Sequence, residues 1–259
     1  MPDDAADLDL SLALADAADE ISLSRFGATD LAVEAKPDLS LVTDADRAVE
    51  ASLRSTLATA RPDDAVSGEE YGSRGSGTRR WVLDPIDGTH SYVRGVPVWA
   101  TLIALLDGDD PVLGVVSAPA LGRRWWARRG AGAWVSALGT APGRLAVSQV
   151  ASLADASMSY SSLHGWRARG VDLETFAAGL WRTRAYGDFW SYMMVAEGVV
   201  DLAAEPELSL WDMAALVPIV TEAGGRFTAL DGGGWQRQHD AAASNGLLHE
   251  ALLAGLHPR

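Results

Sequence analysis

The stretch Trp81–Thr89 constrains this chain most, because an apolar run leads directly into two carboxylates. Residues 81–83 are typical of a buried strand, and Asp84 and Asp87 follow where that strand is expected to end. Carboxylate and carbonyl oxygens are the ligands that Mg²⁺ prefers in proteins. Asp, Pro and Gly are also ordinary turn residues, so a solvated turn is the alternative interpretation of the isolated stretch.

The composition narrows the possible partners. The 259 residues include 21 Lys and Arg against 35 Asp and Glu, which gives a net charge of −14 and argues against binding to nucleic acid or to an anionic membrane surface. With no cysteine, thiolate catalysis and cysteine-based metal sites are excluded. Lys36 is the only lysine, which we attribute to compositional bias. The start of the chain lacks the basic region of a signal peptide and no apolar run reaches membrane-span length, so we expect a cytoplasmic protein.

The first half of the chain is expected to mix helices with antiparallel strands. Thr43 has the residue type and position of a helix N-cap. Residues 61–80 are rich in Gly, Ser, Arg and Asp and are interpreted as a connecting loop. Periodicity predicts helices over 5–25 and 44–60, paired strands over 98–106 and 111–118, and further β structure over 125–135.

The second half alternates strands with helices, which is typical of an α/β lobe. The pattern weakens around 136–155, where we place the lobe boundary. Pro218 is expected to kink the last helix before Gly224 and Gly225 stop it. The expected elements are strands over 157–161 and 199–203 and helices over 171–181, 189–198 and 211–223.

Three segments far apart in the sequence each present carboxylates at an expected element boundary. Glu69 lies in the first, Asp84 and Asp87 in the second, and Asp212 at the start of an apolar helix in the third. Taken alone, Asp212 would be a helix cap that complements the dipole, and adjacent glutamates are usually solvated. Their combination and order are more informative than any one of them.

Gly-Glu-Glu at 68–70, the Asp84–Thr89 stretch and Trp-Asp-x-Ala-Ala at 211–215 resemble the signature order of the inositol monophosphatase family. The resemblance extends upstream to 36–46 and covers about residues 8–250. It implies a layered αβαβα sandwich, of mixed α+β and α/β class, and a homodimer. An N-terminal α+β lobe, 1–145, would carry most metal ligands, and a C-terminal α/β lobe, 146–259, would carry Asp212 and the specificity residues.

The same resemblance implies two or three Mg²⁺ ions. Their ligands would be the carboxylates of Glu69, Asp84, Asp87 and Asp212 and the backbone carbonyl of Ile86. Crowded carboxylates repel one another unless cations neutralise them, so the residue chemistry agrees. A water would attack the phosphate after losing a proton either to Glu69 or to Thr89 hydrogen-bonded to Asp46, and both assignments remain open.

Within the family the chain is most similar to the actinobacterial histidinol-phosphate phosphatases, for example over 93–99, 117–126 and 204–211. This implies dephosphorylation of L-histidinol phosphate to L-histidinol in histidine biosynthesis. The alternatives are an inositol monophosphatase, a broad-specificity sugar-phosphate phosphatase, or a non-catalytic relative. The substrate-binding residues implied are Asp87, Gly88, Thr89, Arg184, Gly187, Asp188, Glu205 and Asp212.

The organic part of that substrate carries an ammonium group and an imidazole ring. Asp188 and Glu205 are our candidates for the ammonium. Trp190 or Tyr160 would pack against the ring, although a place in the core or at a lobe interface is the alternative for either aromatic residue.

Overall fold

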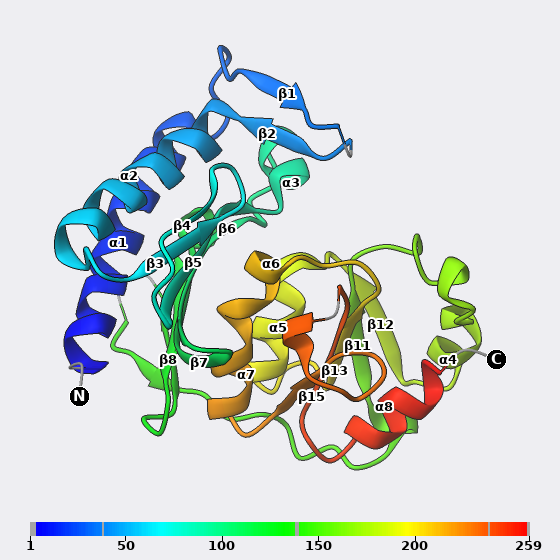
Figure 1. Ribbon diagram of the computed structural model, residues 1–259. Coiled ribbons are helices and arrows are strands. Elements are labelled where there is room, and N and C mark those ends of the chain that lie inside the picture. The colour runs from blue at the N-terminus through cyan, green and yellow to red at the C-terminus, as the bar shows by residue number, and fades with distance from the viewer. Residues whose placement is uncertain (1–3, 38, 138–139, 238, 258–259) are drawn as a thin grey trace.

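Two β-sheets with helices on both faces of each make up the chain (Figure 1). The computed structural model describes residues 4–37, 39–137, 140–237 and 239–257. Asp38, in the upstream loop that carries the family resemblance, lies outside the described residues.

The larger sheet has eight strands in the order β10-β9-β8-β7-β6-β5-β3-β4. Along β6, Leu102 and Ala104 enter one apolar core, while Ile103 and Leu105 enter another on the opposite face. A strand buried on both faces reads as a continuous apolar run, and this explains the composition of the stretch. The strands are β3 (Ala65–Gly68), β4 (Gly72–Arg74), β5 (Arg79–Asp87), β6 (Ala100–Asp107), β7 (Asp110–Ala118), β8 (Arg123–Arg128), β9 (Ala133–Ala137) and β10 (Gly143–Arg144).

Helices α1 (Asp4–Arg25) and α2 (Asp44–Ala60) form the outer layer on this sheet, as the blue pair in Figure 1 shows. Leu14 and Leu53 from the two helices pack with Trp81 of β5. Thr43 caps α2 as predicted, since its hydroxyl accepts hydrogen bonds from the backbone N–H groups of Ala45 and Asp46.

The smaller sheet has five strands in the order β12-β11-β13-β15-β14. Ala203 of β13 faces the core between the sheets, whereas Leu202 and Ala204 face a third core on the outer side. Helices α4 and α8 contribute Leu173 and Leu252 to that outer core. These elements are β11 (Ser157–Tyr160), α4 (Leu173–Ala178), β12 (Arg182–Ala185), β13 (Leu202–Glu205), β14 (Arg226–Thr228), β15 (Ala241–Ser244) and α8 (His249–Gly255).

Three helices fill the layer between the sheets. They are α5 (Asp188–Ala196), α6 (Leu210–Ala214) and α7 (Leu216–Glu222). Their side chains share one core with β6, β7 and β13. The predicted αβαβα sandwich is therefore confirmed. A short hairpin, β1 (Val33–Ala35) with β2 (Leu41–Thr43), and helix α3 (Thr89–Val93) lie beside the larger sheet (Figure 1).

The structure differs from the local predictions at three places. The connection expected over 61–80 contains β3 and β4, which are short and both include Ser and Gly, so they gave little strand signal. The strand predicted over 199–203 is β13, which starts later. Val199 instead closes α5, because its backbone N–H donates to the Met194 carbonyl and its side chain is exposed.

The helix predicted over 211–223 is two helices, α6 and α7, separated at Ala215. Pro218 has no N–H to donate to the Ala214 carbonyl, so the helix breaks one turn before the proline. Ala215 also packs closely on the sheet: a Cβ added to Gly114 of β7 would lie 2.2 Å from its carbonyl oxygen. The glycine is thus required for this approach.

The larger sheet ends at Arg144 and the smaller one begins at Ser157. The predicted boundary between residues 145 and 146 falls in this connection and stays a prediction. Trp125 and Trp126 lie within the sheet, in β8, on opposite faces. Among the described residues, no helix combines the length and apolarity that crossing a membrane requires.

Candidate functional site

Three of the predicted acids come together where β5 meets α6. Carboxylate oxygens of Asp84, Asp87 and Asp212 all lie within 4.8 Å of one another. Residues three apart in a regular strand point to opposite faces. The pairing of β5 with β6 shifts between Asp84 and Asp87, which lie opposite Leu102 and Ala100, and this bulge turns both acids toward the same site.

Asp212 has the two roles that the sequence left as alternatives. Its Oδ2 accepts a hydrogen bond of 2.7 Å from the backbone N–H of Ser209 and so caps the start of α6. The same carboxylate belongs to the acid cluster. The cap orients the side chain toward β5, because it ties one oxygen to its own helix.

The cluster is electrostatically strained. Burial, followed by the charges of Glu69, Asp87 and Asp212, raises the pKa of Asp84 well above its ordinary value. Burial also raises the pKa of Asp212 to about 7. Asp84 Oδ1 is buried and has no hydrogen-bond partner among the described residues. A bound cation would remove both the repulsion and the unsatisfied oxygen.

Glu69 is held beside the cluster by a cation of the protein itself. Lys36 Nζ donates to Glu69 Oε1 at 2.8 Å and to Glu70 Oε1 at 2.5 Å. Although burial lowers the pKa of Lys36, the two glutamates raise it on balance. The attribution of this lone lysine to compositional bias therefore missed a contact at the site. The one sign of this role in the sequence was that Lys36 begins the segment 36–46, which resembles the family.

Glu50 of α2 is a second residue that the sequence did not single out. Its carboxylate is fully buried and accepts hydrogen bonds from the backbone N–H groups of Glu70 and Tyr71, at 2.7 and 3.2 Å. A Cβ added to Gly68 would lie 2.1 Å from Glu50 Oε1, so the glycine allows this approach. Glu50 thus fixes the backbone that carries Glu69.

Thr89, Asp46 and Ile86 are also brought together. Thr89 Oγ1 donates to the Ile86 carbonyl at 2.9 Å and lies 3.5 Å from Asp46 Oδ1. Asp46 Oδ2 accepts from the backbone and the hydroxyl of Thr43, at 2.8 and 2.6 Å. Burial raises the pKa of Asp46 to about 6, against these hydrogen bonds.

Gly88 separates the acid stretch from α3. Its φ of 83° lies in the left-handed region, and an added Cβ would lie 3.0 Å from the Val98 carbonyl oxygen and 3.3 Å from Asp188 Oδ2. The segment after it is the short helix α3, with five residues from Thr89 to Val93. The site is therefore narrow at this glycine.

The second half of the chain meets the acids through a turn before α5. Phe189 N donates to Asp87 Oδ2 at 2.7 Å. Burial raises the pKa of Asp188 to about 6. Burial, followed by the charge of Asp188, raises the pKa of Glu205. The Ser161 side chain and the Asp188 backbone lower this pKa, but by less. Asp87, Asp188 and Glu205 thus form an acidic extension of the cluster.

Arg184, which we predicted to bind substrate, makes its hydrogen bond away from the acid cluster. It is exposed on β12, and its Nη1 donates to the neighbouring Thr183 carbonyl at 2.7 Å. Of the two predicted aromatic residues, Trp190 packs against the core between the sheets and Tyr160 against the outer core. Both aromatic side chains therefore pack against a core, as the alternative interpretation has it, but each is only partly buried.

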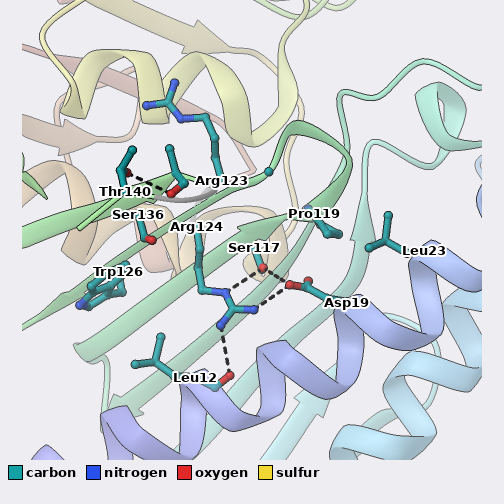
Figure 2. A pocket seen from close by; sticks show the side chains of 12 residues that line it. Leu12, Asp19, Leu23, Ser117, Pro119, Arg123, Arg124, Trp126, Ser136 and Thr140 are labelled. Atoms are coloured by element: carbon teal, nitrogen blue, oxygen red, sulfur yellow. Dashed lines mark hydrogen bonds and ion pairs between the residues drawn. The ribbon is translucent and has the colours of Figure 1, made fainter. Parts of the chain in front are cut away.

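A separate cavity of about 470 Å³ lies between α1 and the strands β7–β9 (Figure 2). Arg124, Ser117 and Asp19 are hydrogen-bonded to one another on its wall, as the dashed lines show. None of the predicted site residues is among the described residues that line it. The cavity is thus distinct from the acid cluster.

Comparison with known proteins identifies relatives along the whole chain. The model of the inositol monophosphatase family matches residues 4–258. The chain is 59% identical to a histidinol-phosphatase of Streptomyces coelicolor, with 100% of both chains covered. It is 58% identical to a histidinol-phosphatase of Mycobacterium tuberculosis, with 96% of this chain and 97% of the relative covered. The solved structure of the Thermotoga maritima IMPase superposes with a TM-score of 0.86 at 30% identity and covers 96% of each chain.

Proposed function

The chain belongs to the inositol monophosphatase family, and we propose that it hydrolyses L-histidinol phosphate to L-histidinol and inorganic phosphate in histidine biosynthesis. The protein is a phosphatase. The substrate assignment rests on the full-length similarity to two histidinol-phosphatases. Their sequence identity to this chain is nearly twice that of the Thermotoga maritima IMPase. The acidic extension at Asp188 and Glu205 supports the same substrate, because histidinol phosphate carries an ammonium group.

We propose that Glu69, Asp84, Asp87, Asp212 and the Ile86 carbonyl hold two or three Mg²⁺ ions. The fit is supported by the buried, unpartnered Asp84 Oδ1 and by the mutual proximity of three carboxylates. Bound Mg²⁺ supplies charge neutralisation for the phosphate and acidifies water for attack on phosphorus. The positive charge of Lys36 at Glu69 Oε1 would repel a cation bound at the same carboxylate, so metal binding would weaken the lysine contact.

The phosphate group would lie against the backbone of Gly88 and Thr89, beside Asp87 and Asp212. Two arrangements can remove the proton of the attacking water. Glu69 takes it directly, or Thr89 Oγ1 takes it and passes its own proton to Asp46 Oδ1. The 3.5 Å separation of the latter two atoms and the raised pKa of Asp46 are compatible with the second arrangement. In both, Thr43 keeps Asp46 in place through two hydrogen bonds.

The organic part of the substrate would lie toward the second half of the chain. Gly187, Asp188 and Glu205 would contact it there, and Arg184 would reach it from β12 by releasing the Thr183 carbonyl. Asp188 is the better placed acid for an ammonium group next to the phosphate ester, because its Oδ2 lies close to Gly88. Glu205, whose pKa is lowered by the neighbouring Ser161 side chain and Asp188 backbone, would act partly by holding Asp188.

A substrate panel tests the proposal. The purified protein with Mg²⁺ should show its highest kcat/KM for L-histidinol phosphate among that ester, inositol 1-phosphate, fructose 1,6-bisphosphate and adenosine 3′,5′-bisphosphate. A higher value for inositol 1-phosphate would overturn the histidinol assignment while leaving the phosphatase assignment intact. We also propose a cytoplasmic homodimer, which size-exclusion chromatography with light scattering would test for its subunit number.

A further inference from the structure

The turn that joins β12 to α5 comprises residues 186–187 and continues into the first residues of the helix, 188–190, and its backbone is unusual. Gly187 and Asp188 both have positive φ, at 70° and 51°. For a residue other than glycine this conformation costs free energy and persists only where the surroundings impose it. Such a backbone conformation holds the neighbouring side chains in fixed orientations, as a binding site requires.

Three contacts impose the conformation. An added Cβ at Gly187 would lie 2.2 Å from Ser161 Cα, so the turn packs directly on the loop after β11. Glu205 lies beside Ser161 and the Asp188 backbone, both of which lower its pKa, and its buried Oε1 has no hydrogen-bond partner among the described residues. Phe189 N donates to Asp87 Oδ2 at 2.7 Å. The turn is therefore fastened to the acid cluster itself.

Two aromatic side chains of this turn contact one another. The ring centroids of Tyr186 and Trp190 are 5.9 Å apart and the ring planes are inclined by 53°. Tyr186 is 58% exposed, whereas Trp190 packs partly against the core between the sheets. Tyr186 therefore contacts Trp190 and still leaves most of its ring accessible to a ligand, two residues from Asp188.

We propose that Tyr186 and Trp190 form an aromatic platform for the imidazole ring of the substrate, with Asp188 beside it for the ammonium group. The inference rests on the proposed function and adds the residues that read the ring. In histidinol phosphate the ammonium-bearing carbon follows the ester methylene, and the ring lies one methylene further. With the phosphate at Gly88, the ammonium then meets Asp188 and the ring extends toward the exposed Tyr186.

The chemistry of the platform suits this ring. Imidazole is planar and is partly protonated near neutral pH. Tyrosine and tryptophan rings attract a planar cation through their faces. The neighbouring carboxylates of Asp188 and Glu205 favour the protonated ring further. An inositol ring has no charge and no π face, so the platform would discriminate against it.

Tyr186→Ala tests the platform, and Trp181→Ala is a matched control. Trp181 is 67% exposed and flanks the other end of β12. For Tyr186→Ala we expect the ratio of kcat/KM for L-histidinol phosphate to that for β-glycerophosphate to fall about tenfold, mainly through KM. Tyr186→Phe should keep the ratio of the unmodified protein because the ring remains, and so should Trp181→Ala.

Inhibition constants give a second readout that does not depend on turnover. L-histidinol should inhibit Tyr186→Ala more weakly than it inhibits the unmodified protein, while inorganic phosphate inhibits both equally. An unchanged selectivity ratio in Tyr186→Ala, or an equal loss with both esters, would overturn the platform. If the unmodified protein itself fails to prefer L-histidinol phosphate, the proposed function fails, which is a separate outcome.

Discussion

Lys36 Nζ lies 2.8 Å from Glu69 Oε1, so the only lysine of the chain neutralises a glutamate that we propose as a metal ligand. The lysine comes from the segment between β1 and β2, far from Glu69 in sequence. A divalent cation and an ammonium group at the same carboxylate repel one another. Metal binding and the position of this segment are therefore expected to be linked.

Lys36→Met should lower the Mg²⁺ concentration for half-maximal activity. The substitution removes the competing cation, and a charge-assisted hydrogen bond of about 1.5 kcal/mol corresponds to roughly tenfold in metal affinity at most. Titration of the phosphatase activity with Mg²⁺ measures the shift. Arg47→Met is the control, because Arg47 forms an ion pair with Glu34 on the same hairpin without contacting Glu69. A higher Mg²⁺ requirement in Lys36→Met would contradict the competition.

Chemical labelling checks the same link without activity. Lys36 is the only side-chain amine, so mass spectrometry of the peptide that contains it reports its modification by an amine-reactive reagent. We expect faster labelling in Mg²⁺ than in chelator, since metal binding would free the ammonium group. Equal rates would show that the lysine contact survives metal binding.

Asp84→Asn should abolish most activity and yet stabilise the metal-free protein. The carboxylate is 1% exposed and its pKa is raised by burial and by four neighbouring acids, so its charge opposes folding. An amide of the same shape removes that charge, and the thermal midpoint in chelator should rise by several degrees for about 1 kcal/mol. Calorimetry in chelator and in Mg²⁺ measures both states.

The control for this substitution is Asp64→Asn, at another acid with low exposure. Asp64 accepts hydrogen bonds from Trp81 Nε1 at 2.9 Å and from Arg79 Nε at 3.2 Å. Its charge is therefore compensated, and its removal should lower the thermal midpoint without loss of activity. A lower midpoint in chelator for Asp84→Asn as well would show that the cluster is not strained.

The metal-free protein should lose stability as pH rises from about 6.5 to 8. Burial raises the pKa of Asp212 to about 7, and it raises those of Asp84 and Asp87 well above their ordinary values. The native state then binds more protons than the unfolded state, so the free energy of unfolding falls with pH until these groups have ionised. Thermal midpoints in chelator across this window measure the slope, and saturating Mg²⁺ should flatten it.

A buried histidine sets the lower limit of that window. Burial lowers the pKa of His249 to about 4, between the hydroxyls of Thr228 and Ser244. The unfolded state binds the extra proton below about pH 6.5, so this group makes stability rise with pH there. The two effects oppose one another below pH 6.5 and separate above it. A midpoint that rises from pH 6.5 to 8 in chelator would contradict the raised carboxylate pKa values.

The parts of the fold that could be predicted are those determined by residues close together in the sequence. Thr43 caps α2 through its own hydroxyl, and the cap and its helix are both encoded within a few residues. The apolar run before Asp84 is a strand because it is buried on both faces. The short strands β3 and β4 could not be found in this way. Each contains Ser and Gly, and pairing with β5 and with each other makes them strands.

The same distinction holds at the site. The acids were evident from their motifs, but the bulge that turns Asp84 and Asp87 to one side depends on pairing with β6. Lys36 and Glu50 reach Glu69 and its neighbour from separate elements, so no spacing in the sequence predicts them. The conformation of Asp188 likewise depends on Ser161, Glu205 and Asp87.

Asp188→Asn separates charge from backbone conformation at that turn. Asparagine tolerates positive φ about as well as aspartate, so the turn at φ 51° should persist. Burial raises the pKa of Asp188 to about 6, and the neutral amide should therefore leave the thermal midpoint in chelator unchanged or higher at pH 8. The KM for L-histidinol phosphate should rise about tenfold or more, because an ammonium group loses its charged partner.

Asp188→Ala is the companion variant, since alanine in the left-handed region is strained by roughly 1–2 kcal/mol. It should lose both stability and affinity for L-histidinol phosphate, whereas Asp188→Asn loses affinity alone. Steady-state kinetics and thermal midpoints on the two variants give four values to compare. If Asp188→Asn keeps the KM of the unmodified protein, the ammonium group is read elsewhere, and the positive φ of Asp188 then serves only to seat Phe189 N on Asp87.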